Sequence, residues 1–230
     1  MIGMKTALIT GVGRGIGKAL ADKFLSEGWK VIGTVQSTAA STPHKNLSVY
    51  QLDLANPLSI AKRAEQIGRM EPRIDVLINN AGIMPDKDEV RVVPSKLRET
   101  LEVNLIGTID FTERIIPIMN KEGHVVNMSS QAGSLAEADI MEDTHEPYHY
   151  PAYKISKTAL NMYTRTLAVR MDHEKTGIIV SSVHPGWVKT DMGGEEAPTT
   201  PEQAAVEIFK LAVSRPETGQ FWYNGQKFPW

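Results

Sequence analysis

The sequence contains no cysteine among its 230 residues, and this absence excludes disulfides, thiolate catalysis and metal sites built on cysteine. It also lacks any uninterrupted apolar stretch of about 18 residues, so we expect no membrane-spanning helix. Neither sign of charge dominates, since 25 basic and 27 acidic residues give a net charge of −2. This balance does not indicate a nucleic-acid partner. The chain enters its first apolar run without a secretory signal, so we expect a cytoplasmic protein.

Short apolar runs alternate with helical periodicity along the whole chain, and 41% of the residues are hydrophobic, enough for a substantial core. The runs expected to form strands are Ala7–Thr10, Lys30–Val35, Ser48–Leu52, Ile74–Asn79, Gly123–Ser129, Ile178–His184 and Gln220–Tyr223. Helical patterns cover 15–27, 57–70, 95–119, 152–173 and 201–213. The alternation predicts an α/β protein, a single domain over 1–230 with a doubly wound Rossmann fold and a seven-stranded, mostly parallel sheet. The irregular stretches 36–47, 131–151 and 189–200 follow predicted strands, at the sheet edge where ligands bind in such folds.

Four glycines, Gly11, Gly13, Gly15 and Gly17, lie where the first predicted strand gives way to the first predicted helix. Glycines in such a turn let the backbone approach a pyrophosphate, which the free N–H groups of the helix N-terminus can bind. The alternative is a flexible turn without a ligand, but the strand before it and the amphipathic helix after it favour phosphate binding. The spacing differs from the common G-x-G-x-x-G pattern, because Ile16 stands where the last glycine is expected.

Tyr153 and Lys157 stand four residues apart at the start of a helical pattern. This spacing places both side chains on one face of a helix. A neighbouring ammonium favours the phenolate, so we predict a pKa of Tyr153 below the value of about 10 of a free tyrosine. The residue would then donate and accept protons near neutral pH. Two solvated surface side chains are the alternative, which the spacing alone does not exclude.

Together these features resemble the short-chain dehydrogenase/reductase family, and the resemblance covers nearly the whole chain. Six segments match family motifs in the family's order: Thr10-Gly11-x3-Gly15-Ile16-Gly17, Asn79-Asn80-Ala81-Gly82, Asn104 between valine and leucine, Asn127-Met128-Ser129-Ser130, Tyr153-x3-Lys157 and Pro185-Gly186-Trp187-Val188-Lys189-Thr190. The stretches 184–194 and 219–225 look like the carbonyl-reductase and sniffer-like branch of the family.

The resemblance implies an NADP-dependent oxidoreductase that reduces a carbonyl of an aldehyde, ketone or quinone to an alcohol, or catalyses the reverse reaction. Tyr153 would supply the proton, and Lys157 would lower the tyrosine pKa and bind the nicotinamide ribose. Ser130 would hydrogen-bond the substrate oxygen, with Ser129 as its rival and a turn cap as its structural alternative. Asn104 would support a water-linked proton relay, or make a purely structural hydrogen bond.

The preference between the two nicotinamide cofactors depends on the end of the second strand. NAD-binding relatives carry an acid there, whereas this chain has Gln36 and Ser37, and Arg14 offers a guanidinium for a 2′-phosphate. NADP(H) is therefore favoured over NAD(H), although Gln36 stands where the carbonyl-reductase branch commonly has arginine. Asp53 matches a position near adenine, or serves as turn chemistry. The expected cofactor contacts are Gly11, Gly13, Arg14, Gly15, Ile16, Gly17, Gln36, Ser37, Asp53, Leu54, Asn80, Ala81, Gly82, Tyr153, Lys157, Pro185, Gly186, Val188 and Thr190.

The segment between Ser130 and Tyr153 has 22 residues, more than the core family pattern. The excess falls in 135–150, which is rich in acidic residues and contains His145-x3-His149. These histidines suggest a metal site, but a polar loop explains them more simply, and we expect no metal. This loop is expected to line the substrate pocket opposite Trp187 and Met192, which serve as packing in the alternative reading.

Two other functions remain open: an NAD-linked secondary-alcohol dehydrogenase of the same fold, and a dinucleotide sensor without turnover. A sensor has no need of all four predicted catalytic side chains together, which argues against it. For assembly, the resemblance suggests a homodimer through helices 95–119 and 152–173. The sequence supports monomer and dimer almost equally, with a slight preference for the dimer. Met162, Leu167 and Met171 belong either to that interface or to the face that packs on the sheet.

Overall fold

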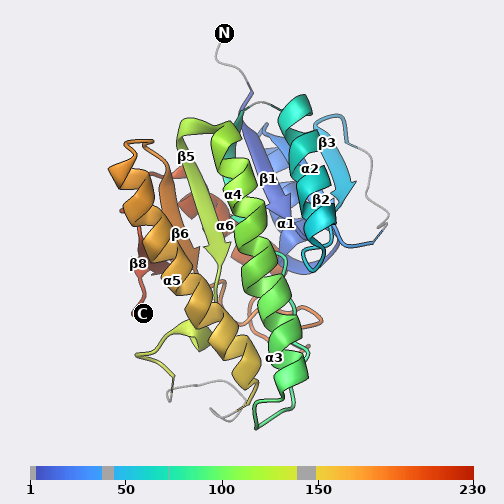
Figure 1. Ribbon diagram of the computed structural model, residues 1–230, viewed down its shortest axis with the longest axis vertical. Helices are drawn as coiled ribbons and strands as arrows, with labels where there is room; N and C mark the ends of the chain where they lie inside the picture. Colours follow the sequence, from blue (N-terminus) through green and yellow to red (C-terminus); the bar gives the residue numbers. More distant parts are fainter. Residues whose placement is uncertain (1–3, 38–43, 72, 139–148) are drawn as a thin grey trace.

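A twisted sheet of eight strands crosses the centre of the computed structural model, which describes residues 4–37, 44–71, 73–138 and 149–230 (Figure 1). The spatial order of the strands is β3-β2-β1-β4-β5-β6-β7-β8. All neighbouring strands pair in parallel except β7 and β8, which are antiparallel. The strands are β1 (Thr6–Thr10), β2 (Lys30–Val35), β3 (Leu47–Gln51), β4 (Ile74–Asn79), β5 (Met119–Met128), β6 (Ile179–Val183), β7 (Gln220–Tyr223) and β8 (Gln226–Lys227).

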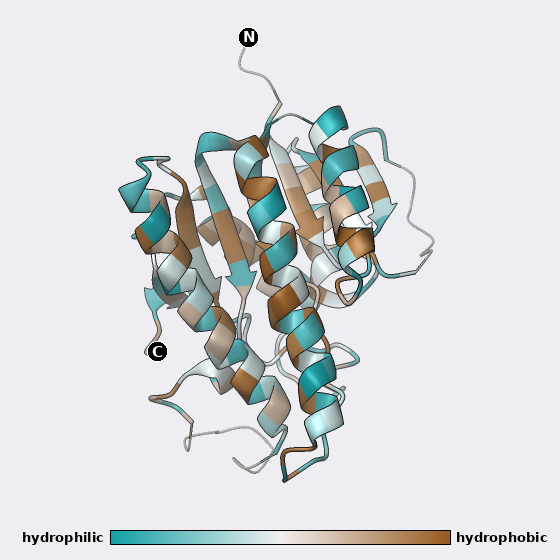
Figure 2. Ribbon diagram, viewed as in Figure 1, coloured by the Kyte–Doolittle hydropathy of each residue, from teal (hydrophilic) through white to brown (hydrophobic). Residues whose placement is uncertain are grey.

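Helices cover both faces of this sheet, as the predicted doubly wound fold requires. The helices are α1 (Gly15–Ser26), α2 (Pro57–Met70), α3 (Pro94–Leu101), α4 (Thr108–Ile115), α5 (Pro151–His173) and α6 (Pro201–Val213). Helices α2, α4 and α5 lie on the near face in Figure 1, with α1 and α6 behind the sheet. Each face has its own apolar core: Leu20 and Ile208 belong to one, and Phe111 and Leu167 to the other. Because both faces are covered, the central strands β1, β2 and β4 are largely apolar and buried (Figure 2).

The expected count of seven strands is wrong by one. Tyr223 pairs with Gln226, so Asn224 and Gly225 alone form the turn between β7 and β8. Both turn residues have positive φ, 47° and 73°, the conformation that a two-residue hairpin of this kind needs. Asn-Gly is the strongest short-range hairpin signal in a sequence, so this strand was predictable from residues 224–225.

The single helix expected over 95–119 is also wrong. After α3 the backbone forms a π-helical segment over Glu102–Gly107, followed by α4 and a short 3-10 turn over Ile116–Ile118, and β5 begins at Met119. At Gly107 the segment packs tightly against the loop before α2, where an added Cβ would lie 1.9 Å from the Leu54 carbonyl oxygen. Within this π-helical segment, the Asn104 side chain accepts a hydrogen bond from Ile83 in the loop after β4. The periodicity of the sequence does not reveal this contact.

The order of the strands places the ligand-binding crevice. The chain runs outward from β1 to β3 in one direction and from β4 to β7 in the other, so the topology reverses between β1 and β4. Ligands of such sheets bind at that reversal, beyond the carboxyl ends of the strands. In Figure 1 the strand arrowheads point downward, and α3 and the first turns of α5 extend beyond this edge.

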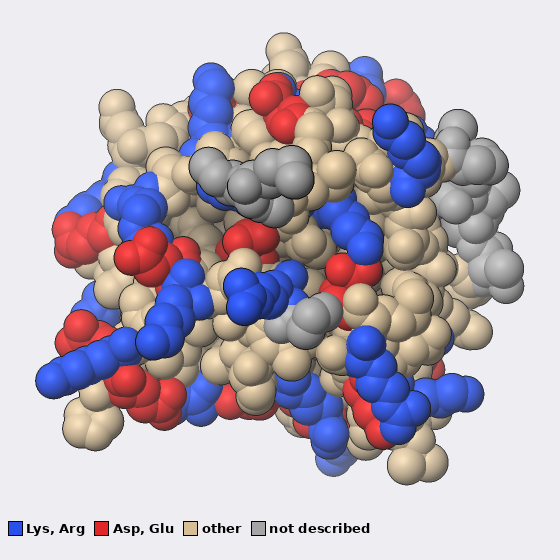
Figure 3. Space-filling view, turned by 90° about the horizontal axis from the view of Figure 1, so that it is seen from above, with Lys and Arg blue, Asp and Glu red and all other residues tan. Residues whose placement is uncertain are grey.

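The surface at the opposite edge of the sheet carries charges of both signs (Figure 3). Lysine and arginine are interspersed with aspartate and glutamate on the face seen in Figure 3. None of the helices in the described part of the chain is long and apolar enough to cross a bilayer.

Candidate active site

The glycine turn after β1 is held in a tight conformation. Gly11 and Gly15 have positive φ, 77° and 55°, a region that L side chains rarely adopt. An added Cβ on Gly17 would lie 2.0 Å from the carbonyl oxygen of Gly11, so the first turn of α1 packs directly on the start of the glycine turn. Gly13 and Arg14 are exposed at its tip, and Ile16 is partly buried against the core. The turn therefore presents backbone and the N-terminus of α1 to the crevice.

The segment after β4 anchors this turn. The Thr10 hydroxyl accepts hydrogen bonds from the backbone N–H groups of Asn80 and Ala81, both at 3.0 Å. The Asn80 amide donates to the carbonyl oxygens of Thr10, at 2.8 Å, and Gly11, at 3.2 Å. The two predicted cofactor motifs are thus one hydrogen-bonded unit across the topological switch.

The predicted catalytic side chains meet at the carboxyl end of β5. Tyr153 and Lys157 lie on α5, and the Lys157 ammonium is 5.4 Å from the centre of the Tyr153 ring. Ser130, directly after β5, forms a hydrogen bond with the Tyr153 side chain. The Lys157 Nζ donates to the carbonyl oxygen of Met128 at 2.8 Å. Helix α5 and strand β5 therefore bring a phenol, a hydroxyl and an ammonium together.

The predicted direction of the Tyr153 pKa shift is wrong for this structure. Burial raises the pKa of Tyr153 to about 12, and the hydrogen bond with Ser130 opposes that shift only in part. Lys157 is 4% exposed, and burial lowers its pKa to about 8. The attraction between ammonium and phenolate favours a lower tyrosine pKa, but the cost of burying both charges outweighs it. The tyrosine is consequently a protonated acid at neutral pH.

The geometry favours Ser130 over Ser129 as the hydroxyl of the site. Ser129 is 2% exposed, and its hydroxyl has no hydrogen-bond partner within the described residues. Ser130 contacts Tyr153 and also accepts from the backbone N–H of Ala132 at 3.2 Å, so it caps a short turn as well. That turn packs closely on α5, because an added Cβ on Gly133 would lie 2.8 Å from Lys157. This contact fixes Ser130 relative to the tyrosine and the lysine.

Asn104 makes the structural hydrogen bonds that were its alternative role. Its Oδ1 accepts from the N–H of Ile83 at 2.8 Å, and its Nδ2 donates to the Ile83 carbonyl at 2.9 Å and the Ser156 hydroxyl at 3.1 Å. A Cβ added to Gly82 would lie 3.3 Å from Asn104 Oδ1 and 3.6 Å from Lys157 Nζ. Gly82 therefore lies beside both the amide and the ammonium, and Asn104 holds the loop that passes Lys157.

The end of β2 carries exposed polar side chains, with Gln36 and Ser37 both at the surface. Arg14 forms an ion pair with Asp191, and their side chains are 82% and 72% exposed. The Asp53 carboxylate accepts a hydrogen bond from the N–H of Ala55 at 3.0 Å, as an aspartate in a turn does. Leu54 beside it is buried.

The loop after β6 reaches over the glycine turn. Gly186 has a φ of 85° beside Pro185, and Val188 is buried. A Cβ added to Gly15 would lie 3.2 Å from the methyl group of Thr190. The indole N–H of Trp187 donates to the Gly193 carbonyl at 2.7 Å, so this side chain braces its own loop.

A cavity of about 420 Å³ lies behind this loop, between α6 and the ends of β6 and β7. Pro185 and Gly186 line it, but Ser130, Tyr153 and Lys157 do not, so it is separate from the predicted catalytic group. Much of the 135–150 segment, including His145 and all of 139–148, lies outside the described residues. The described residues hold no cluster of three or more potential metal ligands.

A buried polar chain beneath the site was not anticipated. Asn79, Asn127 and Ser182 occupy matching positions on β4, β5 and β6. The Asn79 amide donates to Asn127 at 2.8 Å, and both the Asn127 amide and the Ser182 hydroxyl donate to the Thr164 hydroxyl on α5 at 2.8 Å. The available signal was a polar residue at or next to the carboxyl end of each of these three strands. These hydrogen bonds hold α5 on the sheet beneath Tyr153 and Lys157.

The fold is that of a dinucleotide-binding oxidoreductase, and Ser130, Tyr153 and Lys157 lie together at the carboxyl edge of its sheet. The family profile described as short chain dehydrogenase matches residues 5–201, and the chain belongs to that family. Carbonyl reductase [NADPH] 3 of Rattus norvegicus is 30% identical over 93% of this chain and 92% of its own length. Carbonyl reductase Sniffer of D. melanogaster has a TM-score of 0.86 and 28% identity, covering 99% of this chain and 100% of its own. NADPH-bound carbonyl reductase from chicken fatty liver has a TM-score of 0.87 and 26% identity, covering 99% of both chains. The expected family is confirmed.

Proposed function

We propose that the protein is an NADP-dependent reductase of aldehydes, ketones or quinones, which oxidises the corresponding alcohols in the reverse direction. The observation that carries this proposal is the meeting of Ser130, Tyr153 and Lys157 at the carboxyl edge of the sheet. Full-length similarity to carbonyl reductases that use NADPH supports it.

The residues of the crevice fit a dinucleotide. Gly11 and Gly15 have conformations that favour glycine, and side chains there would intrude on Ala81 and Thr190. The N-terminus of α1 offers N–H groups for a pyrophosphate. Beyond β2 no carboxylate stands at Gln36 or Ser37 to repel a 2′-phosphate. We assign the pyrophosphate to the glycine turn, the nicotinamide to the wall formed by Pro185, Gly186, Val188 and Thr190, and the adenine end to Asp53 and Leu54.

When bound, the reduced nicotinamide supplies hydride, which no protein side chain can provide. The chain's own residues handle the proton. Tyr153, protonated at neutral pH, donates its hydroxyl proton to the carbonyl oxygen. Ser130 donates a hydrogen bond to the same oxygen as negative charge develops on it. The Lys157 ammonium stabilises the resulting phenolate, and the loop held by Asn104 keeps Gly82 beside that ammonium.

The preference for NADPH is assigned to Arg14. Arg14→Ala should weaken NADPH binding by about tenfold to a hundredfold, because a charge-assisted hydrogen bond contributes about 1.5–3 kcal/mol. NADH binding should change little, since NADH has no 2′-phosphate. Titrating each cofactor and following the protein fluorescence measures both dissociation constants.

Asp191→Asn is the matched control for Arg14. It removes the ion pair but leaves the guanidinium, so NADPH affinity should hold or rise. Equal losses of both cofactors in Arg14→Ala would show that Arg14 only supports the glycine turn.

The pH dependence of carbonyl reduction should follow Lys157. The lysine, with a pKa lowered to about 8, is charged below that pH and neutral above it. Tyr153, with a pKa of about 12, stays protonated throughout. As pH rises through about 8, the charge that stabilises the phenolate is lost, and kcat should fall by about tenfold per pH unit. Lys157→Arg keeps its charge, so its profile should lack this decline; the same decline in both proteins would refute the assignment.

The activity itself is tested with purified protein, NADPH and a panel of aldehydes, ketones and quinones, by following the absorbance of NADPH. Turnover with NADPH is expected. NADPH binding without turnover on any compound would favour the sensor. Faster turnover of secondary alcohols with NAD would favour the dehydrogenase alternative.

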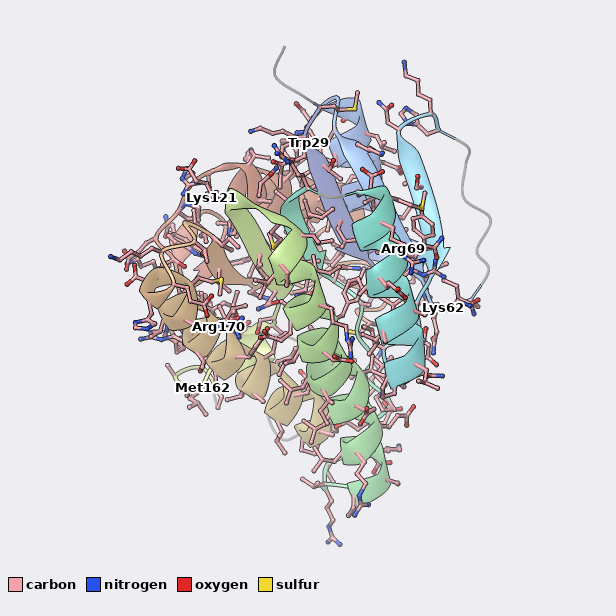
Figure 4. All side chains as sticks on the ribbon, turned by 45° about the horizontal axis from the view of Figure 1, so that its top comes forward. Trp29, Lys62, Arg69, Lys121, Met162 and Arg170 are labelled. Atoms are coloured by element: carbon pink, nitrogen blue, oxygen red, sulfur yellow. The ribbon has the colours of Figure 1, made fainter. Side chains whose placement is uncertain are left out.

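For assembly we propose a homodimer through the outer face of α5. Leu167 and Met171 are 2% and 1% exposed and face the sheet, whereas Met162 is 67% exposed. Met162 projects from the outer side of α5 (Figure 4), and Arg170 of that helix pairs with Glu113 of α4 at 2.9 Å. The two helices therefore present a joined surface with an apolar side chain on it.

Light scattering over a dilution series should give about twice the chain mass of 25.4 kDa. Met162→Asp should shift the protein to monomer, because an unpaired charge opposes burial. Met4→Asp changes a methionine that is 58% exposed just before β1, outside α5, and should leave the mass unchanged. A mass of one chain at every concentration would exclude the dimer.

A further inference from the structure

The loop between β4 and α3 carries a buried carboxylate that has no role so far. Asp86 is 1% exposed. Its Oδ2 accepts hydrogen bonds from the backbone N–H groups of Ala152, at 2.6 Å, and Tyr153, at 3.3 Å. These are N–H groups of the first turn of α5, and one of them belongs to the predicted acid itself.

Helix α5 begins in an unusual way. The residue at its N-cap is Tyr150, in the left-handed conformation with φ 45° and ψ 54°, followed by Pro151. Tyrosine is not one of the residues whose short side chains cap a helix. The cap comes from the loop instead: Asp86 bonds two N–H groups, and the carbonyl of Glu89 accepts the N–H of Tyr150 at 2.9 Å.

We propose that Asp86 is a positioning residue for Tyr153. Its carboxylate fixes the first turn of α5 and thereby sets where the Tyr153 hydroxyl meets Ser130 and the carbonyl substrate. This inference rests on the proposed reductase function. It assigns Asp86 no contact with substrate.

The energetics favour a positional role. A carboxylate that accepts N–H bonds at a helix N-terminus makes charge-assisted bonds and also interacts favourably with the helix dipole. Its second oxygen, Oδ1, is buried without a hydrogen-bond partner among the described residues. Burying an oxygen without a hydrogen-bond partner costs free energy. The hydrogen bonds of Oδ2 to the first turn of α5 offset this cost.

The same loop is fixed at its other end. Ile83, three residues before Asp86, is held through both its N–H and its carbonyl by Asn104. The loop thus connects the predicted relay residue to the backbone of the predicted acid, over a span of four residues. A displacement of about 1 Å at a catalytic group can cost about a hundredfold in rate.

The test compares Asp86→Ala, Asp86→Asn and the control Asp88→Ala, whose carboxylate is exposed two residues further on. In Asp86→Ala, kcat for carbonyl reduction should fall by about tenfold to a hundredfold, with the NADPH dissociation constant within about twofold of wild type. Asp86→Asn keeps an oxygen that accepts both N–H groups and should recover most of the rate. Asp88→Ala should match wild type. Asp86→Ser, which is too short to reach both groups, serves if the alanine variant does not fold, and should also lose rate.

Amide hydrogen exchange at Ala152 and Tyr153 gives a readout besides activity. Exchange there should accelerate in Asp86→Ala and return toward wild type in Asp86→Asn. Unchanged kcat and unchanged exchange in Asp86→Ala would overturn the inference, as would an asparagine variant as slow as the alanine variant. If wild type reduces no carbonyl compound while exchange still responds to Asp86, the proposed function fails and the cap stands.

Discussion

Tyr153→Phe should lower kcat for carbonyl reduction by about 10²–10⁴, because it removes the general acid. That loss corresponds to about 3–5 kcal/mol in the barrier. The phenyl ring keeps its edge contact with Tyr150, whose ring centre lies 6.2 Å away, so the fold should not change. NADPH binding should be retained, since the hydroxyl is only one contact of many. Steady-state kinetics and a fluorescence titration measure the two quantities.

Tyr163→Phe is the matched control, since it removes a hydroxyl from the same helix. Tyr163 donates to Glu113 at 2.9 Å, away from Ser130 and Lys157. Its removal should leave kcat within about twofold of wild type, with a modest loss of stability of about 1 kcal/mol from the lost hydrogen bond. Near-normal turnover in Tyr153→Phe would remove Tyr153 from the role of acid.

Gly17→Ala should disrupt both the glycine turn and the fold around it. The new Cβ would lie 2.0 Å from the Gly11 carbonyl oxygen and 2.5 Å from the Asn80 amide, so backbone must move. We expect a loss of about 3 kcal/mol or more in the free energy of unfolding, at or above the usual cost of overpacking. NADPH affinity should fall by about a hundredfold, equivalent to about 2.7 kcal/mol, because the displaced turn no longer presents its N–H groups to the pyrophosphate.

Gly68→Ala makes the same substitution inside α2, where the new Cβ meets only Ile118 at ordinary contact distances of 3.7 and 3.8 Å. Alanine is the better helix former, so this variant should be stabilised by about 0.5–1 kcal/mol. Urea denaturation compares the two proteins. If both variants gained stability, the close packing of α1 on the glycine turn would be refuted.

Several features of the fold follow from short stretches of sequence. The strands Lys30–Val35, Ile74–Asn79 and Gln220–Tyr223 have the predicted bounds. The helix Pro57–Met70 agrees too, because period and start signals are local properties. The same holds for the glycines at 11 and 15, whose positive φ is a requirement of the turn itself. Even the missed strand β8 was encoded locally, in Asn224-Gly225.

Contacts between distant segments could not be read in this way. Arg14 pairs with Asp191, 177 residues away, and Asp86 caps a helix that begins 65 residues later. The π-helical segment around Asn104 packs closely on Leu54 at Gly107. The periodicity of the sequence does not predict these contacts, because each joins two distant segments that are brought together by the packing of the fold.

The Tyr153–Lys157 pair shows where that boundary lies. Residue type and helical spacing alone were enough to place a phenol beside an ammonium on one face of α5. Only the tertiary structure decided their protonation, because desolvation sums over every group that excludes water, including β5, the loop around Gly82 and the turn at Gly133. Backbone conformation and periodicity are short-range properties of a chain, whereas the cost of burying a charge depends on neighbours from the whole fold.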